Sequence, residues 1–150
     1  MSPAVVVGMM VVSGALMAFQ GPINAALRGH VGVIESAFVS FTVGTVALAV
    51  LVAVVGKGSL GGVRQAPPWQ LLGGLIGVVF VTASLLAVPK IGVPGMIVAA
   101  LAGQMTAGLL IDRFGWVQVP AKPIDLPRLA GVALLVVSVV LINWTNWKKA

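Results

Sequence analysis

Hydrophobic residues fill long runs of the chain, and the charged residues stand almost entirely in the short gaps between these runs. A helix needs about 20 mostly apolar residues to cross the ~30 Å hydrocarbon layer of a bilayer. Five segments reach or approach that length, at approximately residues 3–27, 31–55, 71–88, 91–111 and 129–146. They must be helical, because unpaired backbone groups are too costly in lipid. The pattern predicts an all-α, five-span membrane protein with a single transmembrane domain covering residues 1–150.

The composition supports a membrane protein and argues against several other classes. Of the 150 residues, 59 % are hydrophobic and 8 % are charged, so five spans leave no room for a separate soluble domain. The chain has no Cys and one His, which leaves no convincing metal cluster or catalytic triad. We therefore expect a non-enzyme without a cofactor or metal. We assign the net charge of +6 to loop residues that meet lipid headgroups, and not to nucleic-acid binding.

Five spans would place the two termini on opposite sides of the bilayer, and the basic residues then divide almost evenly. One side would carry Lys57, Arg64, Arg113, Lys122 and Arg128, and the other Arg28, Lys90, Lys148 and Lys149. The excess of Lys and Arg on one side normally orients a membrane protein, and here that excess is a single residue. The chain is therefore expected to insert both ways and to form an antiparallel homodimer, or a pair with a homologue. The alternative is one fixed orientation with another determinant.

Small residues in two expected spans indicate close helix packing, since they let helix backbones approach each other in lipid. The fourth span carries Gly95, Ala99, Gly103 and Ala107 at every fourth position, which makes a smooth ridge on one face. The third span has the pair Gly73 and Gly77. Either ridge could pack within the chain or form a dimer contact.

Polar residues at membrane depth are costly and therefore indicate a substrate pathway. In the first span, Gln20 and Asn24 share a face beside Pro22, which removes a backbone donor. Ser40 in the second span and Gln104 in the fourth complete the predicted pathway. The alternative is that these side chains only join helices through hydrogen bonds.

Two acids are candidates for proton coupling. Glu35 lies near the start of the second span, and a carboxylate in a medium of low dielectric constant binds protons more readily. The alternative is a headgroup-level Glu35 near Arg28. Asp112 ends the fourth span, where it could instead anchor the following loop. Asp125, in a proline-rich loop, is the weakest candidate.

The same polar segments carry a resemblance to a known family. The first two spans include FQGPINAALRGHVGVIESAFVSFTVGT, and the fourth span leads into the fifth through LAGQMTAGLLIDRFGWVQVPAKPIDLPRLAG. The chain resembles, over its whole length, the YdcZ-like family of inner-membrane exporters in the drug/metabolite transporter superfamily. The matching positions are Gln20, Asn24, Ser40, Phe41, Gly44, Thr45, Gly103, Gln104, Asp112, Phe114 and Gly115. Glu35 lies outside these motifs.

The resemblance implies a ten-helix architecture built from two five-helix units, each chain supplying one unit. With the charge pattern, it predicts a multi-pass transporter of the bacterial inner membrane that exports a metabolite or drug-like compound by alternating access. Two other functions stay open: a dual-topology ion channel lined by Ser, Thr, Asn and Gln, and an accessory subunit of another membrane protein.

Overall fold

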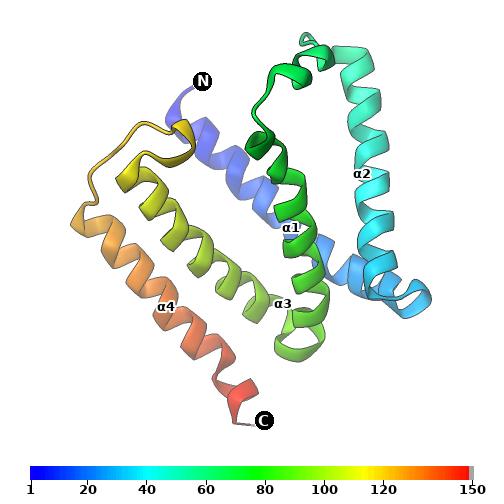
Figure 1. The fold of residues 1–150 in the computed structure, drawn as a ribbon. Coiled ribbons are helices and arrows are strands. Elements are labelled where there is room, and N and C mark those ends of the chain that lie inside the picture. Colours follow the sequence, from blue (N-terminus) through cyan, green and yellow to red (C-terminus); the bar gives the residue numbers. More distant parts are fainter. Residues whose placement is uncertain (149–150) are drawn as a thin grey trace. The chain divides into compact units, whose positions relative to one another are not determined.

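The computed structural model describes residues 1–148, and within that range every regular element is helical. The all-α prediction is therefore confirmed. The α-helices and short 3-10 helices are α1 (Pro3–Val31), α2 (Val33–Val55), η1 (Leu60–Gln65), η2 (Pro68–Leu71), α3 (Leu72–Phe114), η3 (Trp116–Gln118) and α4 (Leu126–Trp147), as drawn in Figure 1. Lys149, one of the basic residues counted above, lies outside the described residues.

The helices begin and end at residues suited to those positions. Ser2 caps α1, its side chain accepting a hydrogen bond from the amide of Val5, and Asp125 caps α4 in the same way through the amide of Arg128. A single residue, Gly32, separates α1 from α2. Its φ of 102° lies in a region that L side chains rarely adopt, so a glycine is suited to this tight connection.

Four helices in residues 1–148 are long and apolar enough to span a membrane. One of them, α3, covers both the third and the fourth predicted spans. As one straight helix, its 43 residues would measure about 65 Å, roughly twice the thickness of the hydrocarbon layer. The backbone of α3 is not helical at Gly92, where φ is 73° and ψ is 170°, between Pro89 and Pro94. The predicted break near Pro89 and Lys90 is therefore present, a few residues further along the chain.

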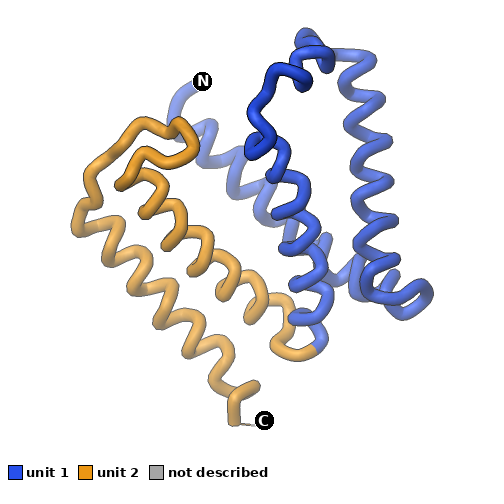
Figure 2. Tube along the Cα trace, viewed as in Figure 1, with its two compact units in different colours: residues 1–89 blue, residues 90–150 orange. Residues whose placement is uncertain are grey.

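The chain divides into two compact units, residues 1–89 and 90–150, which Figure 2 shows in different colours. The first unit contains α1, α2 and the first part of α3. Its core is small, with Ala37, Val81 and Leu85 buried and Ala25, Val33, Phe41 and Phe80 packed against them. Most other large apolar side chains of α1 and α2 are exposed, as expected for helices that face lipid.

The second unit pairs the remainder of α3 with α4. Contacts occur at both ends of the pair, since Asp112 meets Arg128 at one end and Ile91 meets Asn146 at the other. The two helices are therefore antiparallel neighbours. Between them, the loop turns at Gly115 and continues through Val117 and Gln118, which have positive φ angles of 57° and 64°.

Candidate functional site

The polar residues of the first unit meet around Asn24 of α1. Asn24 is only 4 % exposed, and its side-chain Oδ1 accepts a hydrogen bond of 3.0 Å from the hydroxyl of Ser40 in α2. The Ser36 hydroxyl, also in α2, donates to the backbone carbonyl of Asn24 at 2.8 Å. We call Asn24, Ser36 and Ser40 the Asn24 cluster. It brings together two of the predicted pathway residues, Asn24 and Ser40, within a largely apolar helix pair.

Arg28 lies one turn after Asn24 and joins α1 to α3. Its guanidinium Nη1 donates a 2.7 Å hydrogen bond to the backbone carbonyl of Leu85. In a regular helix the amide of residue 89 would donate to this carbonyl, but residue 89 is proline and has no amide hydrogen. Arg28 therefore supplies the donor that Pro89 cannot, next to the buried core.

The other two predicted pathway residues, Gln20 and Gln104, are exposed. Gln20 lies one helical turn before Asn24, near the middle of α1, and Gln104 lies midway along the second part of α3. The two glutamines belong to different units. The structure thus joins Asn24 to Ser40, and the wider cavity shared with Gln20 and Gln104 stays a prediction.

Glu35 lies in the first turn of α2 and is exposed. Its carboxylate is directed back over Gly32, so close that a side chain at position 32 would collide with it. A negative charge at this end of a helix is favourable, because the unpaired amides there carry partial positive charge. This placement supports an electrostatic role for Glu35 at the start of α2, while proton coupling by Glu35 stays a prediction.

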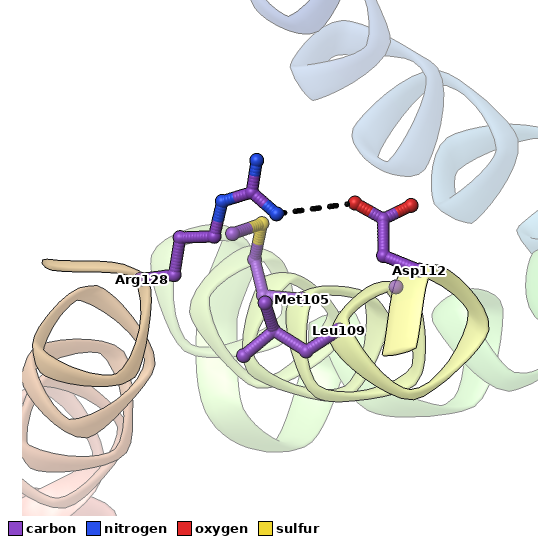
Figure 3. Close-up of a pocket in the computed structure, with 5 residues that line it drawn as sticks. Met105, Leu109, Asp112 and Arg128 are labelled. Atoms are coloured by element: carbon purple, nitrogen blue, oxygen red, sulfur yellow. Dashed lines mark hydrogen bonds and ion pairs between the residues drawn. The ribbon is translucent and has the colours of Figure 1, made fainter. Parts of the chain in front are cut away.

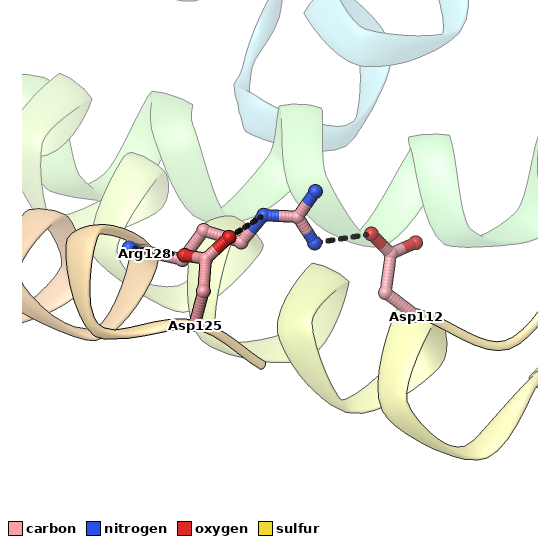
Figure 4. A network of polar contacts seen from close by, with 3 residues as sticks. All are labelled: Asp112, Asp125 and Arg128. Atoms are coloured by element: carbon pink, nitrogen blue, oxygen red, sulfur yellow. Dashed lines mark hydrogen bonds and ion pairs between the residues drawn. The ribbon is translucent and has the colours of Figure 1, made fainter. Parts of the chain in front are cut away.

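Asp112 ends a network of charges in the second unit. Its Oδ2 lies 3.4 Å from Nη1 of Arg128, and Nε of Arg128 lies 3.6 Å from Oδ2 of Asp125. Figure 4 shows the guanidinium between the two carboxylates. The backbone carbonyl of Asp112 also accepts a 2.7 Å hydrogen bond from the amide of Lys122. Asp112 therefore anchors the loop between α3 and α4, as its position in the sequence had suggested.

A cavity of about 240 Å³ lies beside this ion pair. Its lining consists of Met105, Gly108, Leu109, Asp112 and Arg128. In Figure 3, Asp112 and Arg128 extend toward each other beside Met105 and Leu109. The cavity therefore combines an apolar wall with one negative and one positive group, both only partly exposed.

Two of the predicted packing residues make close contacts within the chain. A methyl group at Gly77 would lie 3.3 Å from the ring of Phe41, and one at Gly95 would lie 2.5 Å from Oδ1 of Asn143. Asn143 is 3 % exposed and accepts from the amide group of Asn146, which also donates to the carbonyl of Ile91. The remaining predicted packing residues are open or exposed: Gly73, Ala99, Gly103 and Ala107.

Gly95→Ala should destabilise the second unit, because 2.5 Å is well inside van der Waals contact with Asn143. We expect a loss of about 1–3 kcal/mol, the usual cost of overpacking. Gly14→Ala in α1 is the matched control, since nothing lies within 4 Å of a methyl group there. Thermal unfolding in detergent measures both. Equal melting temperatures for the two variants would show that Asn143 moves aside at no cost.

Sequence reasoning did not select three residues that the structure places in these clusters: Arg28, Ser36 and Arg128. Ser36 carried a usable signal, because it lies four residues before Ser40 and so shares its helix face. From the sequence, Arg128 is only a loop charge, and Arg28 is a loop charge and a possible neighbour of Glu35. Within residues 1–148 there is no group of three His, Asp or Glu side chains that could hold a metal ion.

These features define a multi-pass helical membrane protein with small polar clusters among apolar helices. The family described as "Putative inner membrane exporter, YdcZ" matches residues 5–141. The chain belongs to this family and is an inner-membrane protein, which confirms the resemblance found from its motifs. No curated protein and no solved structure matches the chain.

Proposed function

We propose that the protein exports a small metabolite or drug-like compound by alternating access, as an antiparallel dimer of two chains that each cross the membrane five times. Membership of the exporter family supports export across the inner membrane. The observation that carries the rest is the position of Gln20 and Gln104, polar side chains at mid-helix that residues 1–148 leave exposed. Polar groups at this depth normally face a protein interior or a water-filled pathway. A second chain around a polar substrate pathway would provide that environment.

The interruption of α3 supports five crossings. The part of α3 before Gly92 and the part after it are each long enough to cross a ~30 Å layer at about 1.5 Å per residue. Residues flanking the break, Pro89, Lys90 and Pro94, are typical of a turn near the membrane surface. With α1, α2 and α4, this gives an odd number of crossings.

The open small-residue ridge supports a contact between chains. Ala99, Gly103 and Ala107 repeat every fourth residue along α3, and nothing lies within 4 Å of a methyl group built at Gly103. Gly95, at the start of the same ridge, packs on Asn143 of α4. The ridge therefore leaves a smooth face for another helix beyond that intrachain contact.

The function is tested in liposomes that contain the purified protein and are screened with candidate compounds, with and without a proton gradient. Gradient-dependent movement of one compound class is the expected result. Electrical current without coupling to a gradient would instead identify an ion channel. Co-purification with one different membrane protein in a fixed ratio, without transport, would identify an accessory subunit.

Proton coupling is tested with Glu35→Gln, which keeps the shape of the side chain and removes its charge. We expect loss of proton-driven accumulation with downhill exchange retained, because only the driven cycle needs a group that binds and releases a proton. Asp112→Asn is the comparison for the second candidate acid. If both variants still concentrate substrate with a proton gradient, neither carboxylate couples transport to protons.

A further inference from the structure

The cavity beside Asp112 and Arg128 lies where α3 ends and α4 begins. Immediately beyond it, the rings of Phe114 and Trp116 stack with centroids 5.3 Å apart, and the Trp116 side chain is 53 % exposed. Tryptophan is enriched at the level of the lipid headgroups, where its amphipathic ring is best accommodated. We therefore expect the charged groups of the cavity to lie at headgroup level. Met105 comes about two helical turns before Asp112 in α3, on the side that leads into the membrane.

The two ends of the cavity differ in chemistry, from Met105 to the Asp112–Arg128 pair. Met105, 43 % exposed, and the partly buried Leu109 form an apolar surface of the kind an acyl chain contacts. Gly108 adds no side chain between them, and nothing lies within 4 Å of a methyl group built there. The opposite end of the cavity carries the carboxylate of Asp112 and the guanidinium of Arg128.

The ion pair is open enough to exchange partners. The side chains of Arg128 and Asp112 keep 39 % and 32 % of their surface exposed, and their closest atoms are 3.4 Å apart. A guanidinium has five N–H donors. Within residues 1–148, Nη1 of Arg128 donates to Asp112 and Nε lies 3.6 Å from Oδ2 of Asp125, which leaves Nη2 to bind an anion.

We propose that this cavity binds a phospholipid whose zwitterionic headgroup contains a primary ammonium, as in phosphatidylethanolamine. The phosphate would accept hydrogen bonds from Arg128, the ammonium would donate to Asp112, and an acyl chain would lie along Met105 and Leu109. A headgroup with both charges matches the site better than an anionic one, because a second negative group would face Asp112. A quaternary ammonium carries the same charge but has no N–H to donate. This inference does not depend on what the protein transports.

Delipidated protein in detergent is titrated with three lipids of identical acyl chains, and native mass spectrometry counts the bound molecules. We expect phosphatidylethanolamine to bind about tenfold more tightly than phosphatidylcholine or phosphatidylglycerol, about 1.4 kcal/mol. Asp112→Asn should remove the preference for ethanolamine over choline, and Arg128→Gln should weaken binding of all three lipids. Arg113→Gln, an exposed neighbour that makes no ion pair within residues 1–148, is the matched control and should change nothing.

A variant that leaves the ion pair intact keeps the test valid if the Asp112 or Arg128 variants fail to fold. Leu109→Phe fills part of the cavity along its apolar wall and leaves the Asp112–Arg128 ion pair unchanged. It should reduce lipid binding while the loop between α3 and α4 stays anchored. Equal binding of the three lipids, or no change in any cavity variant, would overturn the proposal. Soluble glycerophosphoethanolamine, added as a competitor, distinguishes a lipid from a free zwitterion. Competition at lipid-like concentrations would show that the acyl chain contributes nothing, and would also overturn it.

Discussion

Asn24→Leu is expected to reduce export by about tenfold or more, equivalent to at least about 1.4 kcal/mol in the transport barrier, while insertion and assembly remain normal. Leucine has the same branched arrangement of four side-chain heavy atoms as asparagine, so among apolar residues it changes the shape at this buried position least. The substitution removes the acceptor of the Ser40 hydroxyl and the only side-chain amide of the Asn24 cluster. Rates of uptake into inverted vesicles, normalised to the amount of inserted protein, measure the effect.

The size of the transport loss in Asn24→Leu distinguishes a substrate-pathway role of Asn24 from a role in helix packing alone. An interhelical hydrogen bond in a membrane contributes about 0.6 kcal/mol on average, which is too little to unfold the protein. A large loss of transport with an unchanged melting temperature would therefore reflect contact with the substrate. Normal transport by Asn24→Leu would show that the cluster only joins α1 to α2.

Two hydroxyl residues of α2 provide a matched pair for the same assay. Ser40 donates across to Asn24 in α1, whereas Thr42 donates to the carbonyl of Phe38 in its own helix. Ser40→Ala should therefore impair export, and Thr42→Val should not, although each removes one hydroxyl. Equal behaviour of the two variants would contradict a specific role for the Asn24 cluster.

The sequence predicts the helical class and most helix positions because the constraint behind them is strong. A lipid-exposed backbone must form helices, so apolar length alone locates α1, α2 and α4 to within a few residues. The break in α3 is less well predicted. Pro89 suggested a turn at its own position, but Arg28 satisfies the carbonyl of Leu85, and the helix continues until Gly92 leaves helical geometry.

Partners across helices were harder to predict than positions along one helix. Helical periodicity places Gln20 and Asn24 on one face, but it does not say which of Ser36, Ser40 or Thr42 that face meets. The Asp112–Arg128 pair joins residues 16 apart across a proline-rich loop. The predicted end of the fourth span at residue 111 and the predicted start of the fifth at residue 129 already place these residues close together. A loop of fixed length between antiparallel helices would have been sufficient to suggest the pair.

Fixing the protein in one orientation is expected to abolish export, because an antiparallel dimer needs copies inserted both ways. Ser59→Lys with Gly62→Lys raises the basic count on the side of that loop from five to seven, against four on the other. Both positions are exposed, and nothing lies within 4 Å of a methyl group at Gly62. Ser59→Gln with Gly62→Gln is the neutral control and should retain activity. A reporter fused to the C-terminus reads the orientation of each variant.

Removing basic residues from the same side is expected to favour the opposite insertion orientation. Changing Lys57, Arg64 and Lys122 together to Gln lowers that count from five to two, which favours the reverse orientation. Each variant alone should be inactive, and co-expression of the two should restore export, since the pair again supplies one chain of each orientation. Recovery in the mixture excludes misfolding as the reason for inactivity of the single variants. If either variant is fully active alone and its reporter lies on one side only, the functional unit is not an antiparallel dimer.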